Sequence, residues 1–175
     1  MENCMTVTTP GPFCFTLAVA AFAALATTGC ADDESAHGET PQEEACEHFE
    51  DGPFASAVAS EATSDLADVT IEHTSVNVAL SQTTEGPYVG NVSFAAEDAT
   101  EYLFMFDADV PVMIFDRDGN EVVIEASESG QSYCDALAMI HRVDLLVGTY
   151  TLSFGPTDVA AFNMVHEEAA GAHDD

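Results

Sequence analysis

The chain contains no lysine and no tryptophan, and its only Lys or Arg side chains are Arg117 and Arg142. Against these two stand 32 Asp and Glu residues, which give the 175 residues a formal net charge of −30 at pH 7. Nucleic-acid binding depends on Lys and Arg neutralising phosphates, and docking on anionic lipid also needs basic residues. The composition therefore predicts no nucleic-acid partner and favours a soluble monomer. Hydrophobic residues make up 47% of the chain, as expected for a folded domain rather than an acidic disordered one.

The sequence also lacks the motifs that carry common enzyme chemistry. It has no HExxH, no phosphate-binding glycine loop and no nucleophile elbow, and its serines stand without a base at a recognisable spacing. We therefore predict that the protein is not an enzyme.

A short apolar run lies near the N-terminus, from Phe13 to Leu25. It is too short to span a bilayer, which needs ~20 residues, but fits the core of a secretory signal. The run leads into Ala-Thr-Thr-Gly29-Cys30, which resembles the lipobox of bacterial lipoproteins. The resemblance implies that residues 1–29 are removed and that Cys30 is acylated. It also implies a lipid anchor in the outer membrane or on the periplasmic side of the cell envelope.

The cysteine count fits an exported protein. Two of the five cysteines lie in the predicted signal and a third would carry lipid, which leaves Cys46 and Cys134. An even pair in an oxidising compartment predicts a disulfide, worth roughly 4 kcal/mol for a loop of this length. The alternative is that both thiols hold a metal ion, with Cys46-Glu47-His48 supplying further ligands.

Composition divides the rest of the chain into three segments. Residues 30–53 are rich in acids and lack apolar periodicity, which predicts an acidic flexible tether. Residues 54–166 alternate between short apolar runs and turn residues, which predicts an antiparallel all-β sandwich of about 8–9 strands, jelly-roll or Ig-like. Residues 167–175 are predicted to be an acidic disordered tail. The strands are expected near 76–80, 88–94, 102–106, 110–115, 122–124, 137–145, 150–154 and 159–165.

Three segments of this region are similar to the bacterial pre-peptidase C-terminal type of β-sandwich. They are VSFAAEDATEYLFMF, VPVMIFDRDGNEV and VDLLVGTYTLSF, between Val92 and Phe154. Within them, Asp118-Gly119-Asn120 is the strongest hairpin signal of the chain. Members of that family are non-catalytic accessory modules, so the resemblance implies a binding or spacer role.

Histidines provide one candidate metal site. His141 shares the apolar face of its predicted strand, and His166 lies at the end of the last strand. If those strands are neighbours, His141 and His166 could bind Zn²⁺ or Cu²⁺ together with Glu167 and His173. The alternative is that His141 is an ordinary core residue and His166 a strand end. His73 and His37 have the pattern of solvated residues.

Closely spaced carboxylates provide a second candidate site, for Ca²⁺. Its oxygen ligands would come from Asp107, Asp109, Asp116, Asp118 and Asn120. The alternative is that Asp116 to Asn120 form only a hairpin turn, because Asp and Asn side chains accept backbone hydrogen bonds in turns.

These observations favour a secreted, lipid-anchored, non-enzymatic β-sandwich that presents a surface to a protein or glycan ligand. The alternative is an envelope protein that binds a divalent metal. No other cofactor is predicted.

Overall fold

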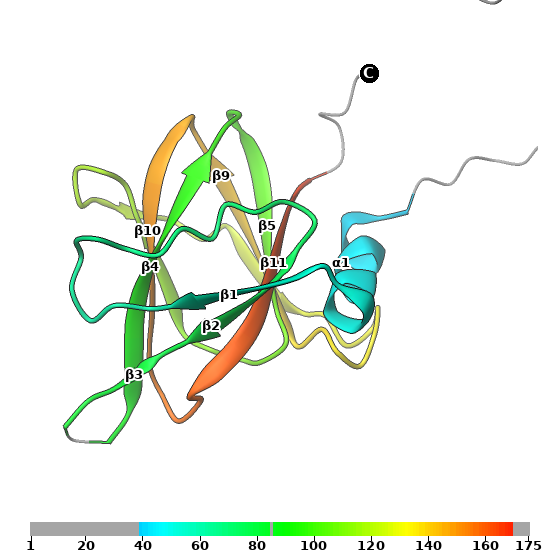
Figure 1. Cartoon of the computed structure of the whole chain (residues 1–175). Helices are drawn as coiled ribbons and strands as arrows, with labels where there is room; N and C mark the ends of the chain where they lie inside the picture. The colour runs from blue at the N-terminus through cyan, green and yellow to red at the C-terminus, as the bar shows by residue number, and fades with distance from the viewer. Residues whose placement is uncertain (1–38, 85, 170–175) are drawn as a thin grey trace, which may run out of the picture. The chain divides into compact units, whose positions relative to one another are not determined.

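The computed structural model describes residues 39–84 and 86–169 (Figure 1). The predicted signal peptide, the predicted lipidation site Cys30 and His173 lie outside these residues. Predictions for those parts of the chain are therefore not addressed by the fold.

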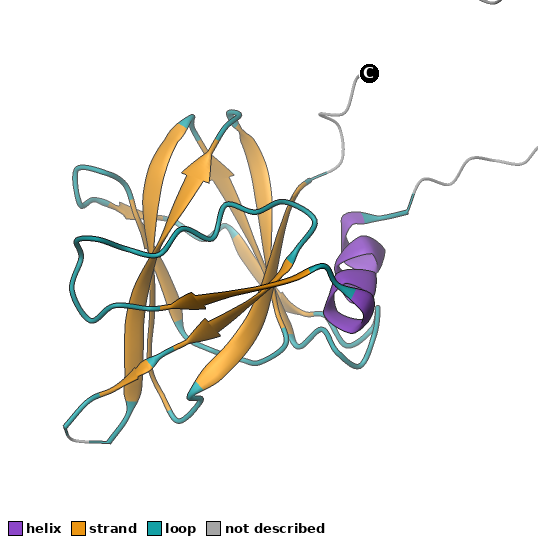
Figure 2. Cartoon of the chain, in the orientation of Figure 1, coloured by secondary structure: helices purple, strands orange, loops and turns teal. Residues whose placement is uncertain are grey.

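Two β-sheets face each other in the described part of the chain (Figure 2). The six-stranded sheet has the order β1 (Phe54–Val58), β2 (Ser75–Ala79), β11 (Ala161–Glu168), β5 (Thr100–Phe106), β9 (Met139–Leu145) and β8 (Ala126–Ser129). The five-stranded sheet has the order β3 (Ser81–Gln82), β4 (Tyr88–Ala96), β10 (Gly148–Thr157), β6 (Val112–Phe115) and β7 (Glu121–Val122). All pairs are antiparallel except β1 with β2.

The predicted all-β sandwich is confirmed, but residues 39–84 and 86–169 form eleven strands rather than eight or nine. The three strands that the sequence does not indicate are β1, β3 and β8. Strand β3 has two residues, too few to alternate, and every residue of β8 is exposed. Strand β1 lies at a sheet edge, where its parallel pairing with β2 leaves no hairpin signal in the sequence. The hairpin predicted at Asp118–Asn120 joins β6 to β7.

Strand β5 shows how the two faces of the six-stranded sheet differ. Tyr102, Phe104 and Phe106 belong to the main core between the sheets, where Phe104 packs edge-to-face on Phe94 with ring centroids 5.0 Å apart. The alternate residues Leu103 and Met105 belong to a second apolar cluster on the other face of the sheet. This outer cluster is where the rest of the chain can pack against the sandwich.

Helix α1 (Pro41–Asp51) lies in the segment for which the sequence predicts a flexible tether, so that prediction is wrong for these residues. Thr40 caps the helix: its hydroxyl accepts from the Glu43 amide, and the Glu43 carboxylate accepts from the Thr40 amide. Proline in the first turn and glutamates near the N-terminus also favour a helix start. Among the described residues, no helix is long and apolar enough to cross a membrane.

The predicted disulfide is confirmed, and it joins α1 to the sandwich. Cys46 bonds to Cys134, 88 residues further along, in the loop between β8 and β9. Around this bond, α1 packs on the outer cluster of the six-stranded sheet. The cluster consists of Ala45, Leu103, Met105, Leu137, Ile140 and Val165, with Cys46, Phe49, Cys134 and Ala169 at its margin.

The last strand extends further than the sequence indicates. β11 continues to Glu168, so Glu167 and Glu168 are strand residues rather than part of a disordered tail. Their pairing with Leu103 and Tyr102 of β5 continues the ladder, and the Ala169 amide donates to the Glu101 carbonyl. Glu167 is thereby fixed on the face covered by α1.

The acidic composition leads to a prediction about salt. Arg142 pairs with Glu101 at 3.2 Å and with Glu128 at 3.4 Å, and a net charge of −30 leaves most carboxylates to repel one another. Raising NaCl from about 0.01 M to about 1 M shortens the Debye length from about 30 Å to about 3 Å. We expect the melting temperature to rise over this range. A melting temperature that stays flat or falls contradicts this reading of the charge.

Candidate metal centre

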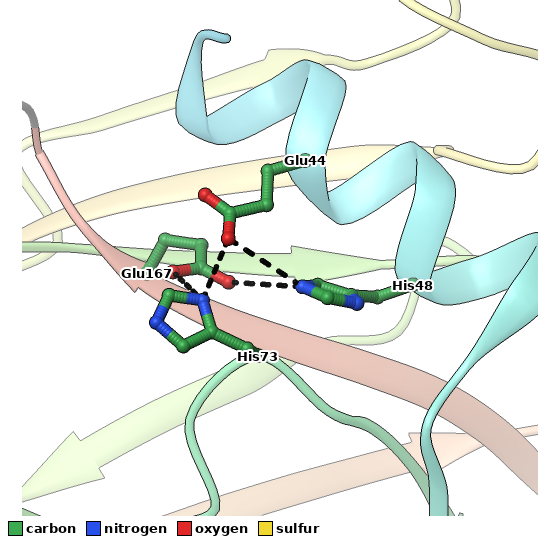
Figure 3. Close-up of side chains that lie close together, drawn as sticks. All are labelled: Glu44, His48, His73 and Glu167. Atoms are coloured by element: carbon green, nitrogen blue, oxygen red, sulfur yellow. Dashed lines mark ion pairs between the residues drawn. The ribbon is translucent and has the colours of Figure 1, made fainter. Parts of the chain in front are cut away.

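Four side chains from three separate segments meet on the outer face of the six-stranded sheet, beside α1 (Figure 3). Glu44 and His48 come from α1, His73 from the loop before β2, and Glu167 from β11. One nitrogen or carboxylate oxygen of each residue lies within 4.8 Å of those of the other three. In Figure 3 all four side chains point toward one common position.

Helix geometry places the first two residues side by side. Glu44 and His48 are four positions apart, and residues at this spacing lie on the same face of a helix. The His48 Nε2 atom is 3.7 Å from Glu44 Oε1. The cap at Thr40 fixes the residue at which α1 begins. It therefore helps to set which side chains of the helix, Glu44 and His48 among them, face the cluster.

Strand alternation places the third residue. Phe162, Met164 and His166 of β11 point into the main core, while Val165 belongs to the outer cluster. Glu167 follows the parity of Val165 and points out toward α1, yet its side chain is only 7% exposed because the helix covers it. The carboxyl group of Glu167 is thus held almost entirely away from solvent.

His73 completes the group from a turn with unusual backbone geometry. Its φ is +49°, in the left-handed region that L residues seldom adopt. Such positions are costly and persist where surrounding structure demands them, often at functional sites. From this turn, His73 Nδ1 lies 2.7 Å from Glu44 Oε1 and 3.3 Å from Glu167 Oε2. The strained turn brings an imidazole nitrogen between two carboxylates.

His48 is oriented in the way that metal-binding histidines usually are. Its Nδ1 is 3.1 Å from the Gly52 carbonyl oxygen, and because a carbonyl can only accept, Nδ1 carries the proton. In the neutral imidazole the lone pair is then on Nε2, which faces the cluster. A backbone carbonyl that fixes the tautomer in this way is a common outer contact of metal ligands.

Two buried atoms of the cluster lack hydrogen bonds within the described part of the chain. They are His48 Nε2 and Glu167 Oε1, which lie 4.0 Å apart. Buried polar atoms are normally hydrogen-bonded, and each exception calls for an explanation. A cation between these two atoms would satisfy both.

Electrostatics around Glu167 point the same way. Burial, and next the neighbouring Glu44 carboxylate, raises the pKa of Glu167 from its ordinary value of 4.5 to about 8, although His48 opposes the shift. Without a cation the site therefore holds a proton on this carboxyl near pH 7. A bound divalent cation would replace that proton and favour the ionised form.

The spacing of these atoms is close to that of a tetrahedral zinc site. Zinc binds nitrogen and oxygen at about 2.1 Å, so neighbouring tetrahedral ligands lie about 3.4 Å apart. His48 Nε2 is 3.7 Å from Glu44 and 4.0 Å from Glu167 Oε1. His73 Nδ1 is 3.3 Å from the other oxygen of Glu167, Oε2, so one of these two oxygens would turn toward the ion on coordination. The fourth distance, Glu44 to His73, is 2.7 Å and would lengthen by less than 1 Å on coordination. Two imidazoles and two carboxylates are also ligands that zinc accepts.

The histidine pair proposed from the sequence is not brought together. Strand β5 lies between β9 and β11, so His141 and His166 are two strand spacings apart, about 9.5 Å. Both rings are packed in the core: His166 lies edge-on to Phe94, and His141 Nδ1 is 2.7 Å from the Ser127 hydroxyl. Burial lowers the pKa of His166 to about 4 and lowers that of His141 as well. Of the four predicted ligands, Glu167 alone belongs to the cluster described here, and His173 lies beyond the described residues.

Three of the five proposed calcium ligands, Asp107, Asp116 and Asn120, have side chains engaged in hydrogen bonds. The Asp116 carboxylate accepts from the Asp118 amide and from both the amide and the side chain of Asn120. These contacts, led by the Asn120 side chain, lower the pKa of Asp116. Asp107 accepts from the Asn163 amide and side chain. The structure does not gather Asp107, Asp109, Asp116, Asp118 and Asn120 into one of the ligand groups found among the described residues.

A second group in the described residues consists of carboxylates alone: Glu101, Glu125 and Asp144. Repulsion from Asp144 raises the pKa of Glu125. Glu101 is paired with Arg142, and the other two are exposed at the surface. This group lacks the nitrogen ligands and burial of the site beside α1.

Three of the four cluster residues were not predicted as this site. A signal for two of them is present: Thr40 and Glu43 form a capping-box pattern, and it predicts a helix that would pair Glu44 with His48. His73 has no local signal, because its position depends on how the loop of residues 59–74 returns to the sheet.

No family model matches the chain, and no curated protein matches it significantly. The functional conclusion therefore depends on the geometry of the site itself.

Proposed function

We propose that this protein is a secreted, lipid-anchored β-sandwich that binds one zinc ion through Glu44, His48, His73 and Glu167. The observation that carries this proposal is the convergence of four ligand atoms from three segments, two of them buried without hydrogen bonds. Without a cation this arrangement costs free energy, because it holds two carboxyl groups close together and buries one of them.

Zinc is the best match among common divalent cations. Calcium and magnesium take six or more oxygen ligands, whereas this cluster offers two nitrogens and two carboxylates. Copper(II) accepts the same atoms but favours a square-planar arrangement. With two neutral imidazoles, the two ionised carboxylates give the site a charge of −2, which a divalent cation neutralises.

The proposed activity is binding rather than catalysis. Four protein ligands complete a tetrahedral shell, whereas catalytic zinc sites leave one position for water or substrate. The same reasoning supports a non-enzymatic role in metal capture or in metal-dependent stabilisation of the envelope protein.

Calorimetric titration with Zn²⁺, Cu²⁺ and Ca²⁺ in high salt tests the proposal, because salt screens loose binding to the acidic surface. We expect one Zn²⁺ per chain with saturable binding, and no saturable Ca²⁺ binding. Absence of stoichiometric Zn²⁺ binding would refute the proposal, and tighter binding of Ca²⁺ than of Zn²⁺ would refute the ligand assignment.

Zinc binding is expected to release a proton at neutral pH. Since the pKa of Glu167 is raised to about 8, this carboxyl is mostly protonated at pH 7 and mostly ionised at pH 9. Binding should therefore release about one proton at pH 7 and much less at pH 9, and affinity should increase with pH across this interval. Titrations in two buffers of different ionisation enthalpy measure the proton count. An equal count at both pH values would contradict the role given to Glu167.

The lipid anchor is the second part of the proposal, and it is supported by the signal-like run and by Gly29-Cys30. An acylated Cys30 would hold the domain at the outer membrane or on the periplasmic side of the envelope. We expect Cys30→Ala to release the protein from the membrane fraction into the soluble fraction. If Cys30→Ala stays with the membranes, the anchor is not at this residue.

A further inference from the structure

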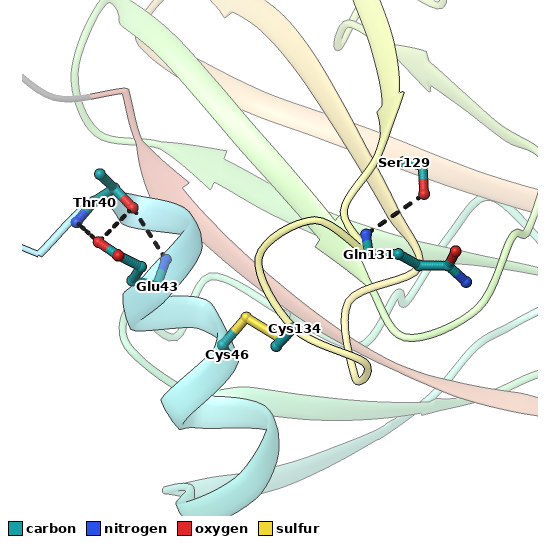
Figure 4. Close-up of a disulfide and its surroundings, with 6 residues drawn as sticks. All are labelled: Thr40, Glu43, Cys46, Ser129, Gln131 and Cys134. Carbon is teal, nitrogen blue, oxygen red and sulfur yellow. Dashed lines mark hydrogen bonds between the residues drawn. A yellow bond between two sulfur atoms is a disulfide. The ribbon is translucent and has the colours of Figure 1, made fainter.

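Helix α1 carries two of the four proposed zinc ligands, yet it belongs to neither sheet. Each residue advances about 100° around a helix. Ala45, which is fully buried, faces the sheet, with Glu44 and His48 on one flank of the helix and Cys46 on the other. The four-residue cluster (Figure 3) and the disulfide (Figure 4) therefore connect the same helix to the sandwich, and the helical spacing places them on its two opposite flanks.

Other attachments of α1 are few. Only Gln42 and Ala45 of its eleven residues are buried, and Phe49 packs at the margin of the outer cluster. Isolated helices of this length are marginally stable in water, so α1 depends on its contacts with the sandwich. The disulfide to Cys134 links α1 covalently to the sandwich at a point between the two proposed ligands of the helix. Cys46 lies two residues after Glu44 and two before His48.

From this arrangement we infer that the Cys46–Cys134 disulfide controls zinc affinity, so that the oxidised protein binds zinc and the reduced protein releases it. The inference rests on the zinc site proposed above. A dithiol reductant supplies two electrons and two protons: the sulfur–sulfur bond breaks, two thiols form, and the reductant becomes a disulfide. Once free on that flank, α1 can leave the sheet and remove Glu44 and His48, which leaves His73 and Glu167 as the remaining ligands.

Thermodynamic linkage makes this coupling reciprocal. If the disulfide raises zinc affinity by a given factor, bound zinc raises the resistance of the disulfide to reduction by the same factor. A tenfold coupling corresponds to about 30 mV in the reduction potential of a two-electron couple. The coupling can therefore be measured either as a change in zinc affinity or as a change in the reduction potential of the disulfide.

The first measurement compares zinc affinities of the full chain carrying Cys4→Ser, Cys14→Ser and Cys30→Ser, so that Cys46 and Cys134 are its only cysteines. A second protein adds Cys46→Ser and Cys134→Ser, which removes the bond without providing new thiol ligands. We expect zinc binding to weaken at least tenfold in the second protein. Equal affinities would overturn the redox inference and leave the zinc site in place, whereas absence of binding in both would overturn the zinc site as well.

The second measurement does not require the disulfide-free protein to fold. The reduction potential of Cys46–Cys134 is determined by equilibration with dithiol buffers, with and without saturating Zn²⁺, in the protein that retains these two cysteines. We expect zinc to make the potential at least about 30 mV more negative, the equivalent of tenfold coupling. Adding His48→Ala should abolish this shift. A potential that zinc does not change would overturn the inference.

Discussion

Replacing His48 by Ala or Glu167 by Gln is expected to weaken zinc binding by about 100-fold or more, equivalent to about 2.8 kcal/mol. His48 supplies a nitrogen whose lone pair is already directed at the cluster by the Gly52 carbonyl. Glu167 supplies the most buried carboxylate of the site. Competition with a chromophoric zinc chelator measures both affinities.

Glu167→Gln separates ligation from folding. Burial raises the pKa of Glu167 to about 8, so the wild-type carboxyl is mostly neutral at pH 7 and glutamine resembles it in charge and shape. A carboxyl whose pKa is raised on folding makes the protein less stable as pH rises above the pKa of that group in the unfolded chain, about 4.5. This loss of stability is complete above pH 8, where the carboxyl is ionised in the folded protein as well. The variant should therefore be at least as stable as the metal-free wild type, and increasingly so at higher pH.

Glu47→Gln is the matched control for these variants. Glu47 lies on the same helix but is exposed and outside the cluster. It removes one negative charge beside the site without removing a ligand, and it should leave zinc affinity within about twofold of wild type. If Glu47→Gln weakens binding as much as Glu167→Gln, the affinity comes from general negative charge and not from the four named residues.

Removing the disulfide with Cys46→Ser and Cys134→Ser is expected to lower the free energy of unfolding by between about 4 and 5 kcal/mol. The bond closes a loop of 88 residues, and the chain-entropy model gives this magnitude for such a loop. Urea denaturation with a chelator present measures the effect without a contribution from bound metal. A loss below about 1 kcal/mol would contradict the chain-entropy account of this bond.

The part of the fold that could be predicted from the sequence is the part fixed by local patterns. Tyr102 to Phe106 alternate between the two faces of β5, and Asp116 to Asn120 form the turn that their side chains favour. The disulfide could be predicted because two cysteines, Cys46 and Cys134, remain outside the predicted signal and the predicted lipidation site. Composition alone does not predict helix α1, because its acidic residues also suit a solvated segment. The capping box at Thr40 and Glu43 is a local signal for where the helix starts, but its stability depends on packing against distant residues such as Leu137.

The candidate site was only partly predictable for a related reason. A strand ending at Val165 would leave His166 and Glu167 together beyond the sheet. The pairing of β11 with β5 continues to Glu168, and alternation then sends His166 into the core and Glu167 toward α1. His73 joins them through a turn at φ +49°, which no short motif specifies. Contacts between segments distant in sequence decided the ligand set.

Anomalous diffraction at the zinc absorption edge, from crystals grown with one equivalent of Zn²⁺, tests the central claim most directly. The predicted result is one strong peak about 2.1 Å from His48 Nε2, His73 Nδ1 and one carboxylate oxygen each of Glu44 and Glu167. A peak at any other group of side chains, or a fully formed cluster without a peak, would contradict the assignment of this site to zinc.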